Sequence, residues 1–112
     1  MKFNRIKLEI YIPETHLKEL QGALLKVDAG HIGNYEGCLS YYRVSGTWRP
    51  LEGADPYNGE VGEISEGEET KVEVIIDADR TAETVAAVRR VHPYEEPVIN
   101  LIPLLPLPGQ KI

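Results

Sequence analysis

The stretch IKLEIYIPETHLKELQGALLKV, residues 6–27, decides the fold, because its pattern changes from that of a strand to that of a helix at a proline. Apolar and polar side chains alternate along residues 6–12, as in a strand with one buried face. Pro13 ends the strand and suits the first turn of a helix. Leucines and Val27 then recur at helical spacing, and Gly30 supplies a C-terminal stop. The sequence therefore predicts a strand followed by a helix.

The rest of the chain predicts three more strands and one more helix. Residues 36–45 and 70–77 have strand patterns, and residues 98–102 form a short apolar run before a proline-rich tail. The second helix is expected to begin near Asp79 or Thr81, either of which can act as the N-cap. Its predicted apolar face consists of Ala82, Val85 and Val88.

The order of these elements predicts the fold class. Pro93 disfavours helical backbone at His92, so the second helix ends there. The order β-α-β-β-α-β, two split βαβ units, predicts an α+β, ferredoxin-like fold with an antiparallel sheet and two helices on one face. We expect a single domain over residues 1–112 with a long loop at about 46–69. The tail at 103–112 is expected to be extended and cannot lie centrally in a sheet, because prolines lack the donor.

Composition excludes several classes of function. The chain has 12 Lys and Arg against 18 Asp and Glu, and its net charge of -6 repels phosphate backbones, so nucleic acid is not expected as a partner. The single Cys38 excludes an internal disulfide and a multi-cysteine zinc site. The N-terminus lacks the apolar core of a signal peptide, and no apolar stretch reaches the roughly 20 residues of a membrane span. We therefore expect a cytoplasmic protein without membrane contact.

Three motifs occur in an order that indicates a family resemblance. They are HIGNYEGC (31–38), GTWRPLEGADPYNGEVGE (46–63) and VHPYEEP (91–97). Together they resemble the inserted middle domain of the YqfO/YbgI family, the Nif-three-like proteins, whose inserts carry GxIGxYxxC, GxFxPxxGxxPxxG and HPYE. The match spans nearly the whole chain, although Ser45 stands where the family has a glycine and Trp48 where it has a phenylalanine.

The resemblance implies a fold like that of the trimeric CutA and PII-like signalling proteins, in agreement with the periodicity. In family members with the full architecture, the insert is flanked by an α/β domain that holds a pair of metal ions on His and acidic ligands. The sequence starts at the first strand of such an insert and ends shortly after its last strand, so we expect a stand-alone version without those flanks. Hydrolase-like chemistry is therefore not carried over, and the interpretation leans away from an enzyme.

The HPYEEP elbow, residues 92–97, permits three interpretations. It is a rigid helix-to-strand junction, a junction that also lines a ligand site, or a reactive acid–base pair. The first is favoured, and the third is least favoured because no nucleophile lies beside the elbow in the sequence. The candidate metal ligands of the chain are His31, Cys38, His92 and Glu95. Their types suit zinc or copper, but they are scattered singly. No cofactor is therefore predicted, and a divalent metal is the weaker alternative.

Aromatic side chains in the long loop indicate a ligand or interface site. Trp48 and Tyr57 lie in a Gly- and Pro-rich loop, where large aromatics commonly anchor a subunit interface or a ligand. The turn at 31–35 is either a tight turn or an anion cradle, without the ending of a P-loop. The residues predicted to line clefts between subunits are His31, Gly33, Tyr35, Trp48, Arg49, Pro50, Tyr57, Gly59, His92, Tyr94 and Glu95.

We therefore expect a non-enzymatic PII/CutA-like module that forms a homo-oligomer, preferably a trimer, and binds a small molecule or protein partner in intersubunit clefts. The alternative is a metal-binding or metal-dependent hydrolase-like protein that uses His31, His92 and nearby acids. Assembly is expected because the sheet face opposite the helices mixes charged side chains with apolar ones, and exposed apolar patches mark interfaces. The side chains assigned to that face are Tyr11, Ile75, Leu101, Lys7, Glu9, Lys71 and Glu73.

Overall fold

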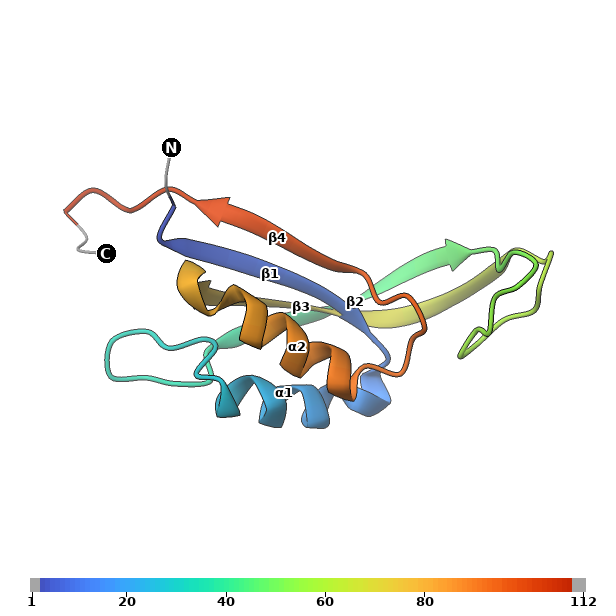
Figure 1. The fold of residues 1–112 in the computed structure, drawn as a ribbon, viewed down its shortest axis with the longest axis horizontal. Helices are drawn as coiled ribbons and strands as arrows, with labels where there is room; N and C mark the ends of the chain where they lie inside the picture. Colours follow the sequence, from blue (N-terminus) through green and yellow to red (C-terminus); the bar gives the residue numbers. More distant parts are fainter. Residues whose placement is uncertain (1–2, 110–112) are drawn as a thin grey trace.

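The computed structural model describes residues 3–109, which form a four-stranded antiparallel sheet with two helices on one face (Figure 1). The predicted order β-α-β-β-α-β and the ferredoxin-like fold class are therefore confirmed. The sheet has the strand order β2-β3-β1-β4. Its elements are β1 (Arg5–Ile12), α1 (Leu17–Lys26), β2 (Leu39–Trp48), β3 (Ser65–Asp77), α2 (Thr81–Val91) and β4 (Ile99–Leu104), with single 3₁₀ turns at Glu14–His16 and Ala78–Arg80.

The core lies between the sheet and the helices, where the alternation in β1 predicts it. Leu8, Ile10 and Ile12 are fully buried, and the register sets Leu8 opposite Val74 and Ile10 opposite Val72 of β3. The helices cover these side chains with Leu20, Leu24, Ala87 and Val88. Each of the larger side chains contributes about 1.5–3 kcal/mol through burial, so this layer provides most of the stabilisation of the fold.

The buried face of helix α2 agrees with the prediction at Val88 but not at Ala82. Ala82 is exposed, and the buried positions of the helix are Thr84, Ala87 and Val88. The hydroxyl of Thr84 donates a 2.7 Å hydrogen bond to the carbonyl of Arg80, so this polar side chain can be buried without an unpaired donor. The predicted capping by Asp79 or Thr81 was also wrong, because the chain enters α2 through a 3₁₀ turn and no side chain caps the helix.

Strand β3 is longer than predicted and β2 begins and ends three residues later than predicted, and their distal ends form a projecting arm. The last residue pair between β1 and β3 joins Ile12 to Thr70, whereas β3 pairs with β2 from Ser65 onward. Residues 44–48 and 65–69, here called the arm, therefore extend beyond the rest of the sheet (Figure 1). The connecting loop is confined to residues 49–64, and the molecule measures 51 × 30 × 23 Å.

The register of β4 corrects one assignment to the open face of the sheet, the face opposite the helices. Leu101 pairs with Leu8, whose side chain points toward the helices, so Leu101 lies on the helix side. Asn100 and Ile102 lie on the open face instead, opposite Glu9 and Lys7. In the part of the chain that the structure describes, no helix has the length and apolar composition needed to cross a membrane.

Candidate functional site

His92 joins the C-terminus of α2 to the end of β1. Its backbone is extended, with φ −80° and ψ 129°, as predicted from the following proline. Its Nε2 donates a hydrogen bond of 2.6 Å to the carbonyl of Tyr11, and its Nδ1 accepts one of 3.2 Å from the backbone N–H of Tyr94. Since one ring nitrogen donates and the other accepts, the imidazole is neutral. Burial lowers the pKa of His92, in agreement with this neutral state.

The buried His92 predicts acid sensitivity of the fold. Because its pKa is lower in the folded than in the unfolded chain, its contribution to stability is present above about pH 6.5 and is lost as the pH falls. Urea unfolding should therefore show the free energy of unfolding declining from pH 7 to pH 5. In His92→Gln this decline should be smaller, and His92→Ala should cost about 1–3 kcal/mol at pH 7 through lost hydrogen bonds.

His31 provides the control for this measurement. The side chain of Asp28 accepts a 2.9 Å hydrogen bond from His31 and raises its pKa, so its contribution is present below about pH 6.5 and is lost as the pH rises. His31→Gln should therefore leave the acid decline in place or steepen it. Equal pH profiles for the wild type and His92→Gln would contradict the role assigned to His92.

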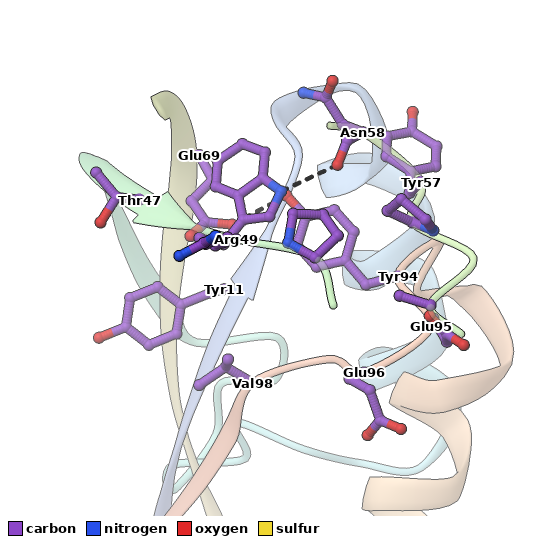
Figure 2. A pocket seen from close by; sticks show the side chains of 14 residues that line it. Tyr11, Thr47, Arg49, Tyr57, Asn58, Glu69, Tyr94, Glu95, Glu96 and Val98 are labelled. Carbon is purple, nitrogen blue, oxygen red and sulfur yellow. Dashed lines mark hydrogen bonds between the residues drawn. The ribbon is translucent and has the colours of Figure 1, made fainter. Parts of the chain in front are cut away.

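A cavity of about 380 Å³ lies between the arm, the 49–64 loop, the end of β1 and the elbow (Figure 2). The chain forms it because the loop returns from the arm toward the elbow, where the backbone N–H of Asp55 donates a 2.9 Å hydrogen bond to Glu95. The cavity, here called the elbow pocket, is lined by Tyr11, Thr47, Trp48, Arg49, Pro50, Ala54, Pro56, Tyr57, Asn58, Glu69, Tyr94, Glu95, Glu96 and Val98.

Two glycines hold Trp48 in the wall of the pocket. The indole donates a 3.0 Å hydrogen bond to the carbonyl of Asn58. A Cβ at Gly59, whose φ is +101°, would lie 2.9 Å from the indole nitrogen and 2.7 Å from the hydroxyl of Ser65. A Cβ at Gly67 would lie 3.3 Å from the ring. The absence of side chains at both positions lets the ring lie directly over the arm.

Aromatic rings also connect the elbow with the loop. The ring of Tyr94 lies 4.8 Å from that of His92 and 5.8 Å from that of Tyr57, measured between centroids. The hydroxyl of Tyr94 donates a 3.0 Å hydrogen bond to Glu69 of the arm. Burial and the neighbouring carboxylate of Glu69 raise the pKa of Tyr94, so it remains a protonated donor at neutral pH. The elbow is thus both a junction and one wall of the pocket.

The structure brings together only part of the predicted site. The predicted residues that line the elbow pocket are Trp48, Arg49, Pro50, Tyr57, Tyr94 and Glu95. Gly59 and His92 support the lining residues Trp48 and Tyr94. His31, Gly33 and Tyr35 belong to the loop at the opposite end of the long axis (Figure 1). Sequence reasoning did not identify Tyr11 and Glu69, which lie on the open face, although the alternation in β1 indicates that Tyr11 is unburied.

The candidate metal ligands lie in separate places. His31 uses both ring nitrogens within its own loop, with Asp28 and with the carbonyl of Gly33, each at 2.9 Å. It shares a surface hollow with Arg5 and Asp77, at the start of β1, whereas His92 contacts the end of β1. Within residues 3–109, no three His, Cys, Asp or Glu side chains are close enough together to hold a metal ion.

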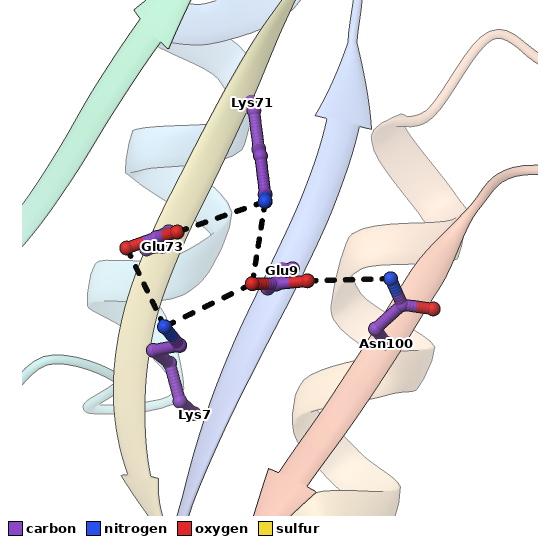
Figure 3. A network of polar contacts seen from close by, with 5 residues as sticks. All are labelled: Lys7, Glu9, Lys71, Glu73 and Asn100. Atoms are coloured by element: carbon purple, nitrogen blue, oxygen red, sulfur yellow. Dashed lines mark hydrogen bonds and ion pairs between the residues drawn. The ribbon is translucent and has the colours of Figure 1, made fainter.

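The open face of the sheet carries a network of paired charges (Figure 3). The ammonium of Lys71 lies 3.3 Å from Glu9 and 3.9 Å from Glu73, and that of Lys7 lies 3.8 Å from Glu9 and 3.6 Å from Glu73. Asn100 donates a 3.3 Å hydrogen bond to Glu9 and is the main cause of the lowered pKa of Glu9. The network contains two charges of each sign, so the centre of this face is electrically neutral.

Proteins of known sequence resemble the chain along most of its length. A "GTP cyclohydrolase 1 type 2 homolog" of Halalkalibacterium halodurans is 41% identical over 98 residues, which cover 88% of this chain and 26% of the relative. A protein of the same description from Mycobacterium leprae is 38% identical over 103 residues, covering 92% of the chain and 27% of the relative. The chain thus spans about a quarter of the length of the curated relatives it matches. No protein-family model matches it.

Solved structures agree with the fold. "Bacillus cereus protein related to NIF3" superposes with a TM-score of 0.80 and 34% identity, over 91% of this chain and 26% of that one. The CutA protein of Archaeoglobus fulgidus gives a TM-score of 0.68 at 18% identity, over 96% of this chain and 87% of its own. The resemblance to a segment of the Nif-three-like proteins is therefore confirmed, and the fold is CutA-like.

Proposed function

We propose that the chain is a non-enzymatic module that assembles into a homotrimer and binds a small ligand or a protein partner beside the elbow pocket, at the clefts between subunits. The observation that supports binding best is the elbow pocket itself. Its volume of about 380 Å³ is in the range of small-molecule sites, and its walls combine aromatic rings with a few polar groups. Pockets of this composition are the default binding sites of small domains.

The arm supports the proposal of assembly. A two-stranded ribbon is marginally stable in water unless something covers it, and the arm projects from the sheet with its own loop and the hydrogen bond from Tyr94 to Glu69 as support. Apolar side chains of the loop are exposed, including Leu51 at 72% and Ile64 at 75%. A neighbouring copy would cover them, and the resemblance to the trimeric CutA and PII-like proteins implies three copies.

The charge network on the open face is compatible with the same assembly. Its four charges are already paired within one chain, so packing against another neutral surface leaves no single charge without a partner. The flanking rings of Tyr11 and Tyr42 lie 5.5 and 5.7 Å from the ammonium of Lys71, and their apolar atoms enlarge the surface available for contact. The face is thus suited to lie inward in a closed ring of subunits.

The geometry favours this module over a metal-dependent hydrolase. The hydrolase would need His31, His92 and nearby acids in one place, but both ring nitrogens of each histidine are engaged, and the two histidines lie near opposite ends of β1. Metal content of protein purified without a histidine tag remains a direct check. Tightly held stoichiometric zinc or iron would favour the hydrolase.

The proposal predicts a trimer in solution. Light scattering at micromolar concentration should give a mass three times the 12.5 kDa of the chain. The expected interface combines the arm, its loop and the open face, and a stable interface of this kind typically buries about 800 Å² on each partner. A monomeric mass at every concentration would refute both the assembly and the intersubunit position of the site.

A further inference from the structure

We infer that the elbow pocket selects a small organic cation, an amine or a quaternary ammonium compound. This inference rests on the proposed function and names the class of ligand for the same site. Three features of the pocket support it: the sign of its charges, the aromatic composition of its walls, and the way its hydrogen-bond donors are already used.

Charge favours a cation. Three carboxylates, those of Glu69, Glu95 and Glu96, line the pocket against one guanidinium, that of Arg49. Arg49 turns its Nε–H toward the loop, where it donates a 3.2 Å hydrogen bond to the carbonyl of Gly62. The pocket therefore has an excess of negative charge, and the net charge of the whole chain, -6, has the same sign. An anionic ligand would be repelled by both.

The walls supply rings that attract cations. Trp48 of the arm, Tyr57 of the loop and Tyr94 of the elbow line the pocket. Tyr11 lies across from Tyr57 and Tyr94 (Figure 2). The faces of such rings carry partial negative charge and bind ammonium groups, most strongly when several rings surround the same space. The protein already uses Tyr11 in this way, since the ammonium of Lys71 lies 5.5 Å from the centre of its ring. Three rings remain for a ligand.

The hydrogen bonds leave acceptors for a ligand. The indole N–H of Trp48 and the hydroxyl of Tyr94 each donate within the protein, to Asn58 and Glu69. An ionised carboxylate offers about four acceptor positions, and Glu69 and Glu95 use one oxygen each in the contacts with Tyr94 and Asp55. These free acceptor positions suit a ligand that donates hydrogen bonds or carries positive charge.

A pair of matched probes tests the charge. Choline and its neutral isostere 3,3-dimethyl-1-butanol have nearly the same shape. A difference in their affinity for the pocket therefore measures the contribution of the positive charge to binding. Trp48 is the only tryptophan of the chain, and it lines the pocket, so its fluorescence reports binding directly. We expect choline to bind at least about tenfold more tightly than the alcohol, from ring and carboxylate contacts together. Ligand-observed NMR provides a second readout for the same two probes.

Two neighbouring glutamates provide matched variants. Glu69→Gln removes the charge but keeps an oxygen for the hydroxyl of Tyr94, and it should weaken choline binding about fivefold or more while leaving the alcohol unchanged. Glu68→Gln is the control, because Glu68 points to the other side of the sheet and lies 3.5 Å from Arg43. It should leave both affinities unchanged, and circular dichroism checks that both variants fold.

The results with the two probes show whether the cation class alone fails or the ligand-binding part of the proposed function fails with it. Equal binding of the two probes would overturn the cation class while leaving the pocket as a ligand site. Weaker binding of choline than of the alcohol would do the same. No response to either probe, in fluorescence or in NMR, would overturn the cation class and the ligand-binding part of the proposed function. The assembly is tested independently by the mass in solution.

Discussion

Gly30→Ala is expected to destabilise the protein by about 3 kcal/mol or more, a large part of the total stability of a domain of this size. Gly30 has a φ of +78°, which costs other residues about 1–2 kcal/mol. A Cβ at this position would also lie 2.3 Å from the carbonyl oxygen and 2.9 Å from the nitrogen of Cys38. Both atoms belong to the backbone, so a side-chain rotation cannot remove the clash.

The clash would break the attachment of α1 to the sheet. The N–H of Gly30 donates a 2.9 Å hydrogen bond to the carbonyl of Ile75 of β3, and its carbonyl accepts one of 2.9 Å from the N–H of Cys38, which directly precedes β2. These bonds close the 31–37 loop and fix where the chain re-enters the sheet. The expected result in urea unfolding is a midpoint well below that of the wild type, with an unchanged slope.

Gly33→Ala distinguishes the two causes of the expected destabilisation, the positive φ and the steric clash of the added Cβ. Gly33 also has a positive φ, +57°, but a Cβ there would meet nothing within 4 Å. Its replacement should therefore cost only the backbone term, about 1–2 kcal/mol. If Gly30→Ala and Gly33→Ala destabilise the protein equally, the backbone near Cys38 relaxes, and the clash contributes nothing.

The core of the fold could be predicted from the sequence because apolar and polar residues alternate in β1 and in residues 70–77 of β3, the two central strands. Leu8, Ile10 and Ile12 alternate with polar residues in β1, so both the strand and its buried face follow from local pattern. Residues 65–69 have the sequence SEGEE, which lacks this alternation, and they form a strand only because their backbone pairs with β2. The loop was therefore predicted too long at both ends.

The buried face of α2 illustrates a second limit of prediction from the sequence. Hydrophobic spacing favoured Ala82 as a core position, whereas the structure buries Thr84, which satisfies its hydroxyl through the carbonyl of Arg80. A buried threonine cannot be predicted from hydropathy, because its burial depends on that local hydrogen bond. The register of β4, which moves Leu101 to the helix side, likewise depends on pairing between distant segments.

The residue types of the candidate site could be predicted from the sequence, but their common position in the fold could not. Aromatic side chains in the loop and at the elbow indicated binding, and Trp48, Tyr57 and Tyr94 do meet at one pocket. Their meeting depends on the loop folding back to Glu95, a contact between residues 40 apart in the sequence. The turn at 31–35 lies at the other end of the molecule, so it can join this site only through another subunit (Figure 1).

Trp48→Ala is expected to convert the proposed trimer into monomers at micromolar concentration. In a single chain Trp48 is 36% exposed although its ring lies over Gly67 and donates to Asn58, so part of its apolar surface is available to a neighbour. Buried tryptophans at subunit contacts commonly account for about 2–4 kcal/mol each. A closed trimer contains three such contacts, so this one substitution removes all three and weakens the assembly by three times the free energy of a single contact.

Tyr41→Ala is the matched control for this change. Tyr41 belongs to the same strand and is 54% exposed, but it pairs with Val72 and therefore lies on the side of the sheet that the helices cover. Its replacement should leave the mass of three chains unchanged, and circular dichroism should show the native strands in both variants. If the Trp48→Ala protein remains trimeric, Trp48 makes contacts only within its own chain and does not stabilise the subunit interface. The clefts between subunits would then have to be formed by the open face, whose paired charges and flanking tyrosines do not depend on the arm.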